Sequence, residues 1–357
     1  MLPFDIIYII IGYSSNLAVL TTIPYFHNIV ELYINQPKFV KYLETVKDAS
    51  RNKYETYDFN LKGLEKIDNL KDFNLPYFIE EFSFSRSNID KFDNFIAPKN
   101  LSIYGTKISH FDDLRAINLK WLDCSGSLIT SLNSLDASNL NTLYCSNTKI
   151  SNFANICLQI LSCNSCPIGN NILKLNTNKL MRLDCIECDI KTFENFKAPF
   201  LESLECSKNP ITTFKNTNMP KLKKLYCDHT AIHSFNGLEK LELQKLKCNN
   251  IILLQTLKYL NVSYLTELDI HGTGISSLIN LNFECLKILD CSYTIITSFI
   301  GFIAPNLEKL RCVGLNIISL DGIKSKLKDL NCSECFIIDF NPNSYDTNSN
   351  SGLGIFF

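Results

Sequence analysis

The sequence predicts an α/β solenoid in which short coils stack on one another, each adding one strand to a parallel sheet, with a small helical module at the amino terminus. One pattern recurs eleven times between Leu119 and Leu327, at intervals of 18 to 22 residues. A period of this length indicates stacked units rather than a single globular core. Apolar and polar residues alternate at the start of each copy, as in a strand with one buried face. Hydrophobic residues make up 46% of the chain, enough for a continuous core.

The repeated pattern is Leu-x-x-Leu-x-Cys-x-x-(Thr/Asn/Cys)-x-Ile-x-x-Phe, and positions are numbered here from its first Leu. Positions four and six lie on one side of the strand and point into the core, whereas positions three and five point outward. Position nine holds small or polar residues that can bond backbone groups where the chain turns. Since no single coil can bury its apolar positions alone, neighbouring coils must bury them together. Clear copies begin at Leu180, Leu201, Leu222 and Leu286, and weaker copies begin at Phe78 and Leu101.

These residues resemble the leucine-rich-repeat family, whose signature is Leu-x-x-Leu-x-Leu-x-x-(Asn/Cys)-x-Leu. The resemblance covers residues 61–340 and implies a solenoid whose concave face of short parallel strands binds other proteins. Because the repeats are short, we expect extended or 3₁₀ segments rather than regular helices on the outer side. Residues 341–357 are expected to form a carboxy-terminal tail or cap.

Ten of the fifteen cysteines occupy position six, where a free cysteine serves as a small hydrophobe. Some cysteines form C-x-x-C pairs, a spacing that also suits zinc ligands. Each pair is positions six and nine of one repeat, so we expect no metal and no cofactor. The alternative is a zinc site formed by Cys163, Cys166, Cys185 and Cys188. Phosphate-binding glycine loops and the common hydrolase motifs do not occur in the sequence, so an enzyme is not expected.

The 35 basic and 36 acidic residues nearly cancel, which predicts neither a nucleic acid nor a membrane as partner. The apolar stretch Phe4 to Tyr13 is too short to span a bilayer and lacks a preceding basic flank. We therefore expect neither a signal peptide nor a membrane anchor. Reduced thiols and a cytoplasmic location follow from that expectation, in the host cytosol if the protein is viral.

Residues 1–45 interrupt the repeat and predict short helices, followed by a charged linker at residues 46–60. This segment resembles the F-box, and the combination resembles F-box-like leucine-rich-repeat proteins of giant viruses and of protists with AT-rich genomes. The resemblance implies docking on a Skp-type adaptor of a cullin-RING (SCF-type) ubiquitin ligase. Pro24 departs from the family pattern, and a simple cap on the first coil is the alternative. The residues matched to the adaptor-binding pattern are Leu2, Pro3, Ile6, Ile7, Ile10, Leu17, Leu20 and Ile23.

Outward positions on the strands predict where a protein partner binds. Their charges alternate in sign, which suits a protein surface better than a phosphate backbone. The sequence therefore predicts a protein-binding module, as the substrate receptor of a ubiquitin ligase or as a stand-alone scaffold with no ligase link. The predicted partner-binding residues are Trp121, Tyr144, Asp184, Glu205, Tyr226, Lys247 and Asp269.

Overall fold

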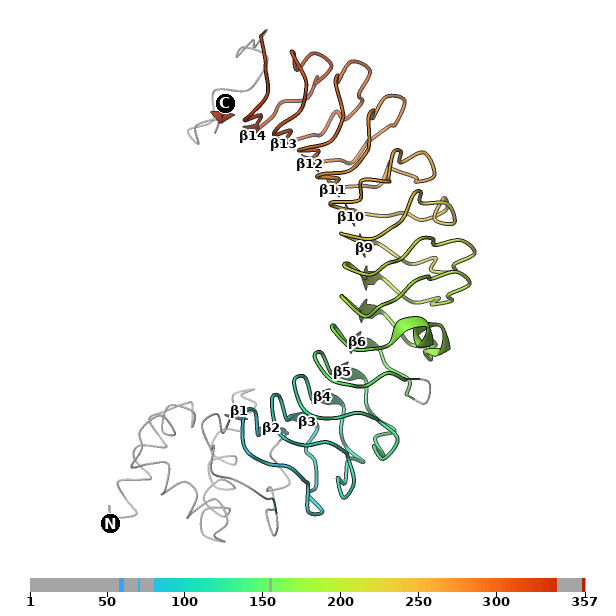
Figure 1. The fold of residues 1–357 in the computed structure, drawn as a ribbon, viewed down its shortest axis with the longest axis vertical. Coiled ribbons are helices and arrows are strands. Elements are labelled where there is room, and N and C mark those ends of the chain that lie inside the picture. Colours follow the sequence, from blue (N-terminus) through green and yellow to red (C-terminus); the bar gives the residue numbers. More distant parts are fainter. Residues whose placement is uncertain (1–57, 61–69, 71–79, 154–155, 339–354, 357) are drawn as a thin grey trace, which may run out of the picture. The chain divides into compact units, whose positions relative to one another are not determined.

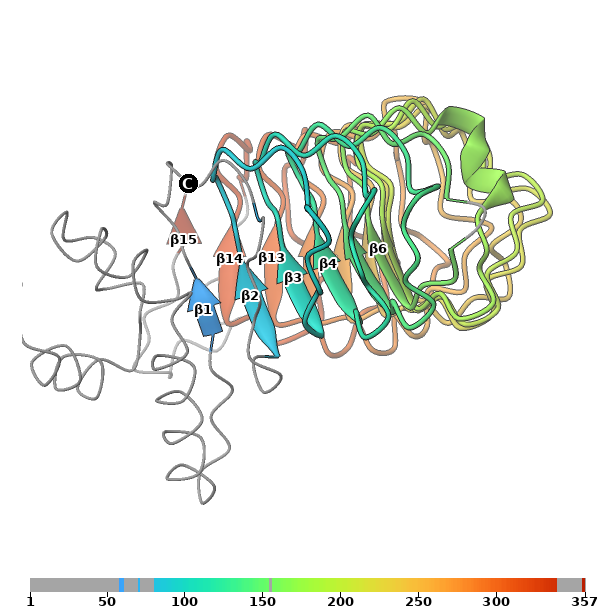
Figure 2. The same cartoon turned by 90° about the horizontal axis from the view of Figure 1, so that it is seen from below.

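The computed structural model describes residues 58–60, 70, 80–153, 156–338 and 355–356. Throughout these ranges the chain winds in coils that each carry one short strand (Figures 1 and 2). The chain divides into two compact units, Met1–Cys166 and Pro167–Phe357, and each unit is described by itself.

The first unit contains a parallel sheet in which each strand pairs with the next strand along the chain. Leu101 lies opposite Phe82 on one side and Leu122 on the other, so equivalent repeat positions stand in register. Figure 2 shows β2, β3 and β4 side by side and pointing the same way. The sheet begins within the stretch predicted as a linker, since β1 covers residues 58–60. The strands are β1 (Asp58–Asn60), β2 (Glu81–Ser83), β3 (Asn100–Ser102), β4 (Trp121–Asp123), β5 (Thr142–Tyr144) and β6 (Ile160–Ser162).

The second unit repeats this arrangement after one 3₁₀ segment, η1 (Gly169–Lys174). Its strands also pair in parallel and in register, and the last of them brings Ile355 opposite Leu330 near the carboxy terminus. The strands are β7 (Arg182–Asp184), β8 (Ser203–Glu205), β9 (Lys224–Tyr226), β10 (Lys245–Lys247), β11 (Glu267–Asp269), β12 (Ile288–Asp290), β13 (Lys309–Arg311), β14 (Asp329–Asn331) and β15 (Ile355–Phe356).

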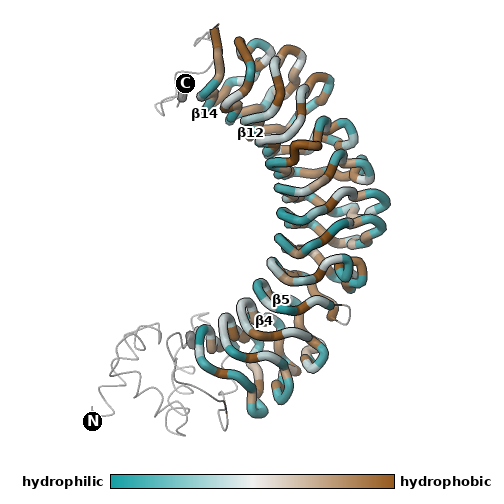
Figure 3. The backbone as a smooth tube through the Cα atoms, viewed as in Figure 1, coloured by the Kyte–Doolittle hydropathy of each residue, from teal (hydrophilic) through white to brown (hydrophobic). Residues whose placement is uncertain are grey.

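Side-chain alternation on the strands follows the predicted register. Leu204 and Cys206 are fully buried on β8 and just after it, whereas Glu205 between them is half-buried on the opposite side. Ile211 and Phe214 return to the same core, where the ring of Phe214 stacks on that of Phe193 at 5.8 Å. Figure 3 shows the resulting alternation of hydrophobic and hydrophilic stretches along each coil. Each buried Leu or Phe contributes roughly 1.5–3 kcal/mol, so the repeated positions supply most of the stability.

In several coils the side chain at position nine is buried and closes the turn with a hydrogen bond. The hydroxyl of Thr148 donates to the carbonyl of Cys145 at 2.7 Å, and that of Thr230 donates to the carbonyl of Cys227 at 2.8 Å. Ser127 makes the same bond to Cys124 at 2.6 Å. The predicted role of position nine, bonding the backbone inside the turn, is confirmed at these coils.

Position eight takes a left-handed backbone conformation in every described coil. Asn147, His229 and Tyr293 have φ values of 57°, 54° and 54°. Glycine fills position eight in four coils. At Gly314 glycine is required for two reasons, the backbone conformation and the lack of space for a Cβ. Its φ is +66°, and a Cβ there would lie 2.7 Å from the ring of Tyr293. In most of these coils the position-eight N–H donates to the carbonyl of position seven in the next coil, as from Gly272 to Ser292 at 2.9 Å.

The outer side of the coils is extended, as the short repeat predicts. Among the described residues, η1 is the one helical segment, and no α-helix occurs. The α component expected of the fold class is therefore absent from this part of the chain. Residues 1–45, predicted to form a helical module, lie outside the described ranges. Within those ranges, no helix has the length and hydrophobicity needed to cross a bilayer.

Candidate protein-binding faces

The outward face of the first unit carries an aromatic pair at neighbouring strands. Trp121 and Tyr144 are both half-buried, and their ring centroids lie 5.7 Å apart. Trp121 is the β4 residue at repeat position three, and Tyr144 is the β5 residue at repeat position five. Tyr144 lies directly opposite Asp123 in the pairing of the two strands. Alternation on the strands thus brings together two residues that the sequence predicts as partner-binding.

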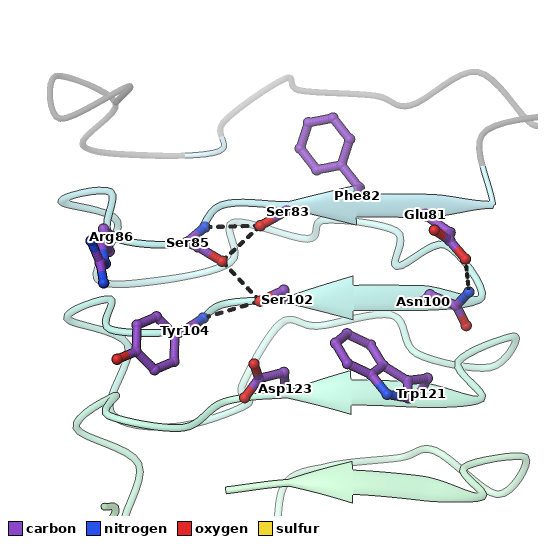
Figure 4. A pocket seen from close by; sticks show the side chains of 10 residues that line it. All are labelled: Glu81, Phe82, Ser83, Ser85, Arg86, Asn100, Ser102, Tyr104, Trp121 and Asp123. Atoms are coloured by element: carbon purple, nitrogen blue, oxygen red, sulfur yellow. Dashed lines mark hydrogen bonds between the residues drawn. The ribbon is translucent and has the colours of Figure 1, made fainter. Parts of the chain in front are cut away.

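A groove of about 560 Å³ lies beside this pair, across β2, β3 and β4 (Figure 4). Its ends differ in chemistry. Arg86 and Tyr104 lie at one end, and Glu81, Asn100 and Trp121 lie at the other. The guanidinium of Arg86 sits 5.7 Å from the centre of the Tyr104 ring, a cation–π contact.

Hydroxyl groups cover the floor of this groove and bond one another. The hydroxyl of Ser85 lies 2.7 Å from that of Ser83 and 2.9 Å from that of Ser102. Asn100 donates to the carboxylate of Glu81 at 2.6 Å. These bonds hold the polar side chains in place, so the groove is preformed.

The second unit presents charged side chains, and one of them departs from the sequence prediction. Asp184 was predicted to be available to a partner, but its exposed fraction is 7%. The guanidinium of Arg182 lies over it, donating from Nε at 3.0 and 3.1 Å to both carboxylate oxygens. Alternation sets the outward direction of this side chain, whereas the long arginine two residues earlier covers it.

Lys247 takes part in an ion-pair cluster on the same face. The ammonium groups of Lys245 and Lys247 lie 2.7 and 3.2 Å from the carboxylate of Glu267. The hydrogen bond from Lys245 holds the pKa of Glu267 below its ordinary value, and the same bond raises the pKa of Lys245. This cluster fixes the position of two cations of β10 against an anion of the adjacent strand β11.

The carboxylates of Glu205 and Asp269 lie on the outward face and also accept hydrogen bonds from other groups of the chain. A carboxylate oxygen of Glu205 accepts the N–H of Ser207 at 3.0 Å, and Asp269 accepts from the side chain of Asn249 at 3.0 Å. Burial raises the pKa of both carboxyl groups. Tyr226, half-buried, pairs with Glu205 on one side and Lys247 on the other. Of the seven predicted residues, six are therefore partly exposed and outward-facing, and Asp184 is covered.

The cysteines at position six are fully or nearly fully buried, which confirms their predicted place in the core. Cys157 is half-buried and Cys285 is exposed. Among the described residues, no three or more His, Cys, Asp and Glu side chains come together as metal ligands. The cysteines considered for zinc, at positions six and nine of neighbouring repeats, form no such group in these ranges. The residues predicted to bind an adaptor, Leu2 to Ile23, lie outside the described residues.

Several residues of the groove were not predicted from the sequence. Ser83, Ser85, Arg86 and Tyr104 belong to the two weakest copies of the repeat, which lack cysteine at position six. These strands could have been located from the sequence, because the two weaker copies contain Phe82 and Leu101, which occupy the same register position as Leu122 in the next coil. Their outward positions could have been read in the same way as those of later coils.

No protein-family model and no curated protein matches the chain, whereas several solved structures have a similar fold. An internalin (inlF) from Listeria monocytogenes has a TM-score of 0.55 and 21% identity, over 72% of this chain and 86% of that chain. The functional domain of InlJ from the same organism, which includes a cysteine ladder, has a TM-score of 0.51 and 19% identity, over 83% and 70%. A leucine-rich-repeat protein from Leptospira interrogans has a TM-score of 0.50 and 14% identity, over 87% and 98%.

These likenesses, together with the repeat and the parallel strands, show that the chain has the leucine-rich-repeat fold. In this chain cysteine replaces the usual leucine at position six of ten repeats. At such low identity the likeness extends to the fold alone.

Proposed function

We propose that this protein is a binding scaffold that holds a protein partner on its strand faces and acts as the substrate receptor of an SCF-type ubiquitin ligase. The observation that carries the binding role is the register of outward side chains. Aromatic and charged groups stand at fixed spacing on paired strands, as with Trp121 beside Tyr144 and Lys245 beside Glu267. A preformed surface of this kind loses little conformational freedom when a partner binds. No catalytic step is part of this proposal.

The link to a ligase rests on the sequence resemblance of residues 2–32 to the F-box, placed ahead of a leucine-rich-repeat solenoid. In this proposal the amino-terminal segment docks on a Skp-type adaptor, and the solenoid presents a target to the ligase in the cytoplasm. Apolar residues such as Ile6 and Leu17 would then lie at the adaptor interface rather than in a cap.

Mixing the full chain with a Skp-type adaptor and measuring the complex by size-exclusion chromatography with light scattering tests the ligase role. We expect a stable complex with the native chain and none with Ile6→Asp combined with Leu17→Asp. Lys224→Ala, on an exposed strand position, is the matched control and should leave the complex intact. Circular dichroism of each variant checks that the solenoid is still folded.

If adaptors from the natural host form no complex with the native chain, the receptor role is wrong. The remaining function is then the stand-alone scaffold, in which residues 1–45 cap the first coil. Unfolding of the whole chain by the double aspartate variant would support that cap, because a cap buries these residues against the solenoid.

A further inference from the structure

We propose that the groove beside Trp121 binds an extended peptide segment of the partner by a cationic side chain, lysine or arginine, held between the Trp121 and Tyr144 rings and the Asp123 carboxylate. This inference rests on the proposed protein-binding function and names the chemistry of its partner. The volume of the groove, about 560 Å³, suits one or two side chains of a peptide lying across the strands.

The aromatic pair provides one half of a cation site. Trp121 and Tyr144 present tilted rings 5.7 Å apart on adjacent strands, and both remain partly exposed. Ring faces attract ammonium and guanidinium groups electrostatically, with tryptophan the strongest of the aromatic residues. The groove already contains one such contact at its other end, where Arg86 lies over Tyr104.

Asp123 provides the other half, because its negative charge has no counter-ion in the part of the chain that the structure describes. It lies two residues after Trp121 on the same outward side and directly opposite Tyr144. Among the described residues, its carboxylate accepts one hydrogen bond, from the N–H of Ser125 at 2.9 Å, and forms no ion pair. Asp123 is one of the residues that line the groove, so its other oxygen is available to a ligand there (Figure 4).

Asp184, at the equivalent outward position of β7, is matched within the chain by Arg182. Among the described residues Glu205, Asp269 and Asp290 at this position form no ion pair either, so it is the two rings that distinguish Asp123. On β4 the ring of Trp121 stands where β7 places its arginine, and the ring of Tyr144 lies on the next strand. A half-buried carboxylate beside two rings is complementary to a lysine or arginine side chain.

The ends of the groove favour a peptide over an isolated amine. Figure 4 places Arg86 at the end away from Trp121. A carbonyl or carboxylate further along an extended chain could accept from its guanidinium, while the cation occupies the Trp121 end. The hydroxyls of Ser83, Ser85 and Ser102 line the path between the two ends.

A displayed library of random twelve-residue peptides, selected on the immobilised full chain, provides the probe. We expect enrichment of lysine or arginine over the unselected library. An enriched peptide is then synthesised in two forms, with its cationic residue intact or replaced by norleucine or citrulline. Binding can be followed through Trp121, the one tryptophan of the chain, because a bound cation alters indole fluorescence. The neutral form should bind at least about tenfold more weakly.

Asp123→Asn is the decisive variant, since asparagine keeps an acceptor for Ser125 and removes the charge. Asp290→Asn is its matched control, because Asp290 occupies the same repeat position and accepts from Ser292 at 3.0 Å. We expect Asp123→Asn to weaken the cationic peptide about tenfold and Asp290→Asn to change its affinity less than about twofold. Equal thermal stability of the two variants excludes a folding effect.

The inference is overturned if no peptides are enriched, if the enriched peptides lack cationic residues, or if Asp123→Asn binds them as well as the native chain does. Failure here is distinguishable from failure of the proposed function. A chain that forms the adaptor complex, or that selects neutral peptides, is still a protein-binding scaffold whose partner lies elsewhere on its faces.

Discussion

The side-chain nitrogen of Asn209 donates a 2.7 Å hydrogen bond to the carbonyl oxygen of Cys185 in the preceding coil. The same amide group donates to Cys206 in its own coil at 2.9 Å and accepts the N–H groups of Cys188 and Ile190 at 2.9 and 3.0 Å. With an exposed fraction of 1%, it is shielded from water. One buried side chain thus joins the backbones of two coils.

Replacing Asn209 by Ala should cost at least about 3 kcal/mol of unfolding free energy, because several buried backbone groups lose their partner. Asn209→Thr should cost less, since threonine closes neighbouring coils by a single bond, as Thr230 does to Cys227. Urea denaturation followed by circular dichroism measures both variants. A loss below about 0.5 kcal/mol for Asn209→Ala, the range of surface substitutions, would contradict this role.

Glu205 should destabilise the native protein at neutral pH, because burial raises its pKa in the folded state. A carboxyl group with a raised folded pKa opposes folding above that pKa, and the penalty vanishes below its unfolded pKa of about 4.3. Glu205→Gln keeps an acceptor for Ser207 and removes the charge. We therefore expect this variant to be more stable than the native chain at pH 8, by less than about 1 kcal/mol, since solvent screens a half-exposed group.

Glu267→Gln should behave in the opposite way, because the bond from Lys245 lowers the pKa of Glu267 in the folded state. Its stabilisation is complete above the unfolded pKa and is lost as the pH falls through the folded value. The variant should be less stable than the native chain at pH 7, by less than about 1 kcal/mol, and the difference should shrink as the pH falls below the unfolded pKa. Thermal unfolding across this pH range gives both comparisons, and the same sign for the two variants would show that the assignments are wrong.

Thiol reactivity should separate the core cysteines from the rest. Burial raises the pKa of Cys206, Cys227 and Cys248 at position six, so these thiols are both shielded and protonated. In a native protein, a thiol reagent should modify exposed Cys285 fastest, and Cys285→Ser should remove that phase. All fifteen cysteines should react after denaturation. Rapid modification of position six in the native chain, or stoichiometric bound zinc, would contradict the core assignment.

Much of the fold could be predicted because one period fixes many positions at once. The register that buries Leu204 and Cys206 could be predicted from the alternation of apolar and polar residues. The hydrogen bonds made at position nine could be predicted from the small polar residues found there. The left-handed backbone conformation at position eight was harder to predict from the sequence. Glycine marks it at Gly105 and Gly272, whereas His229 and Tyr293 take the same conformation with no such signal.

The exposure of outward side chains was harder to predict than the composition of the core. Alternation along a strand gives the direction of a side chain but not how far neighbouring residues cover it. Asp184 points outward as expected, yet Arg182 covers it. Glu205 points outward as well, but its bond to Ser207 makes it part of the turn. The groove beside Trp121 depends on Ser85 and Tyr104, which follow the strands in two weak copies of the repeat. Such details arise from contacts between neighbouring coils, which the period alone does not specify.

Stacked coils share one core, with repeat position four pointing inward and repeat position three pointing outward. Leu204 at position four is fully buried, and Lys224 at position three of the next strand is exposed. Lys224 is the better control than Glu205, whose carboxylate bonds the backbone. By urea denaturation, Leu204→Ala should cost about 2–5 kcal/mol and Lys224→Ala less than about 0.5 kcal/mol. Equal losses for the two variants would shift the register by one residue and contradict every outward position assigned to the strand faces.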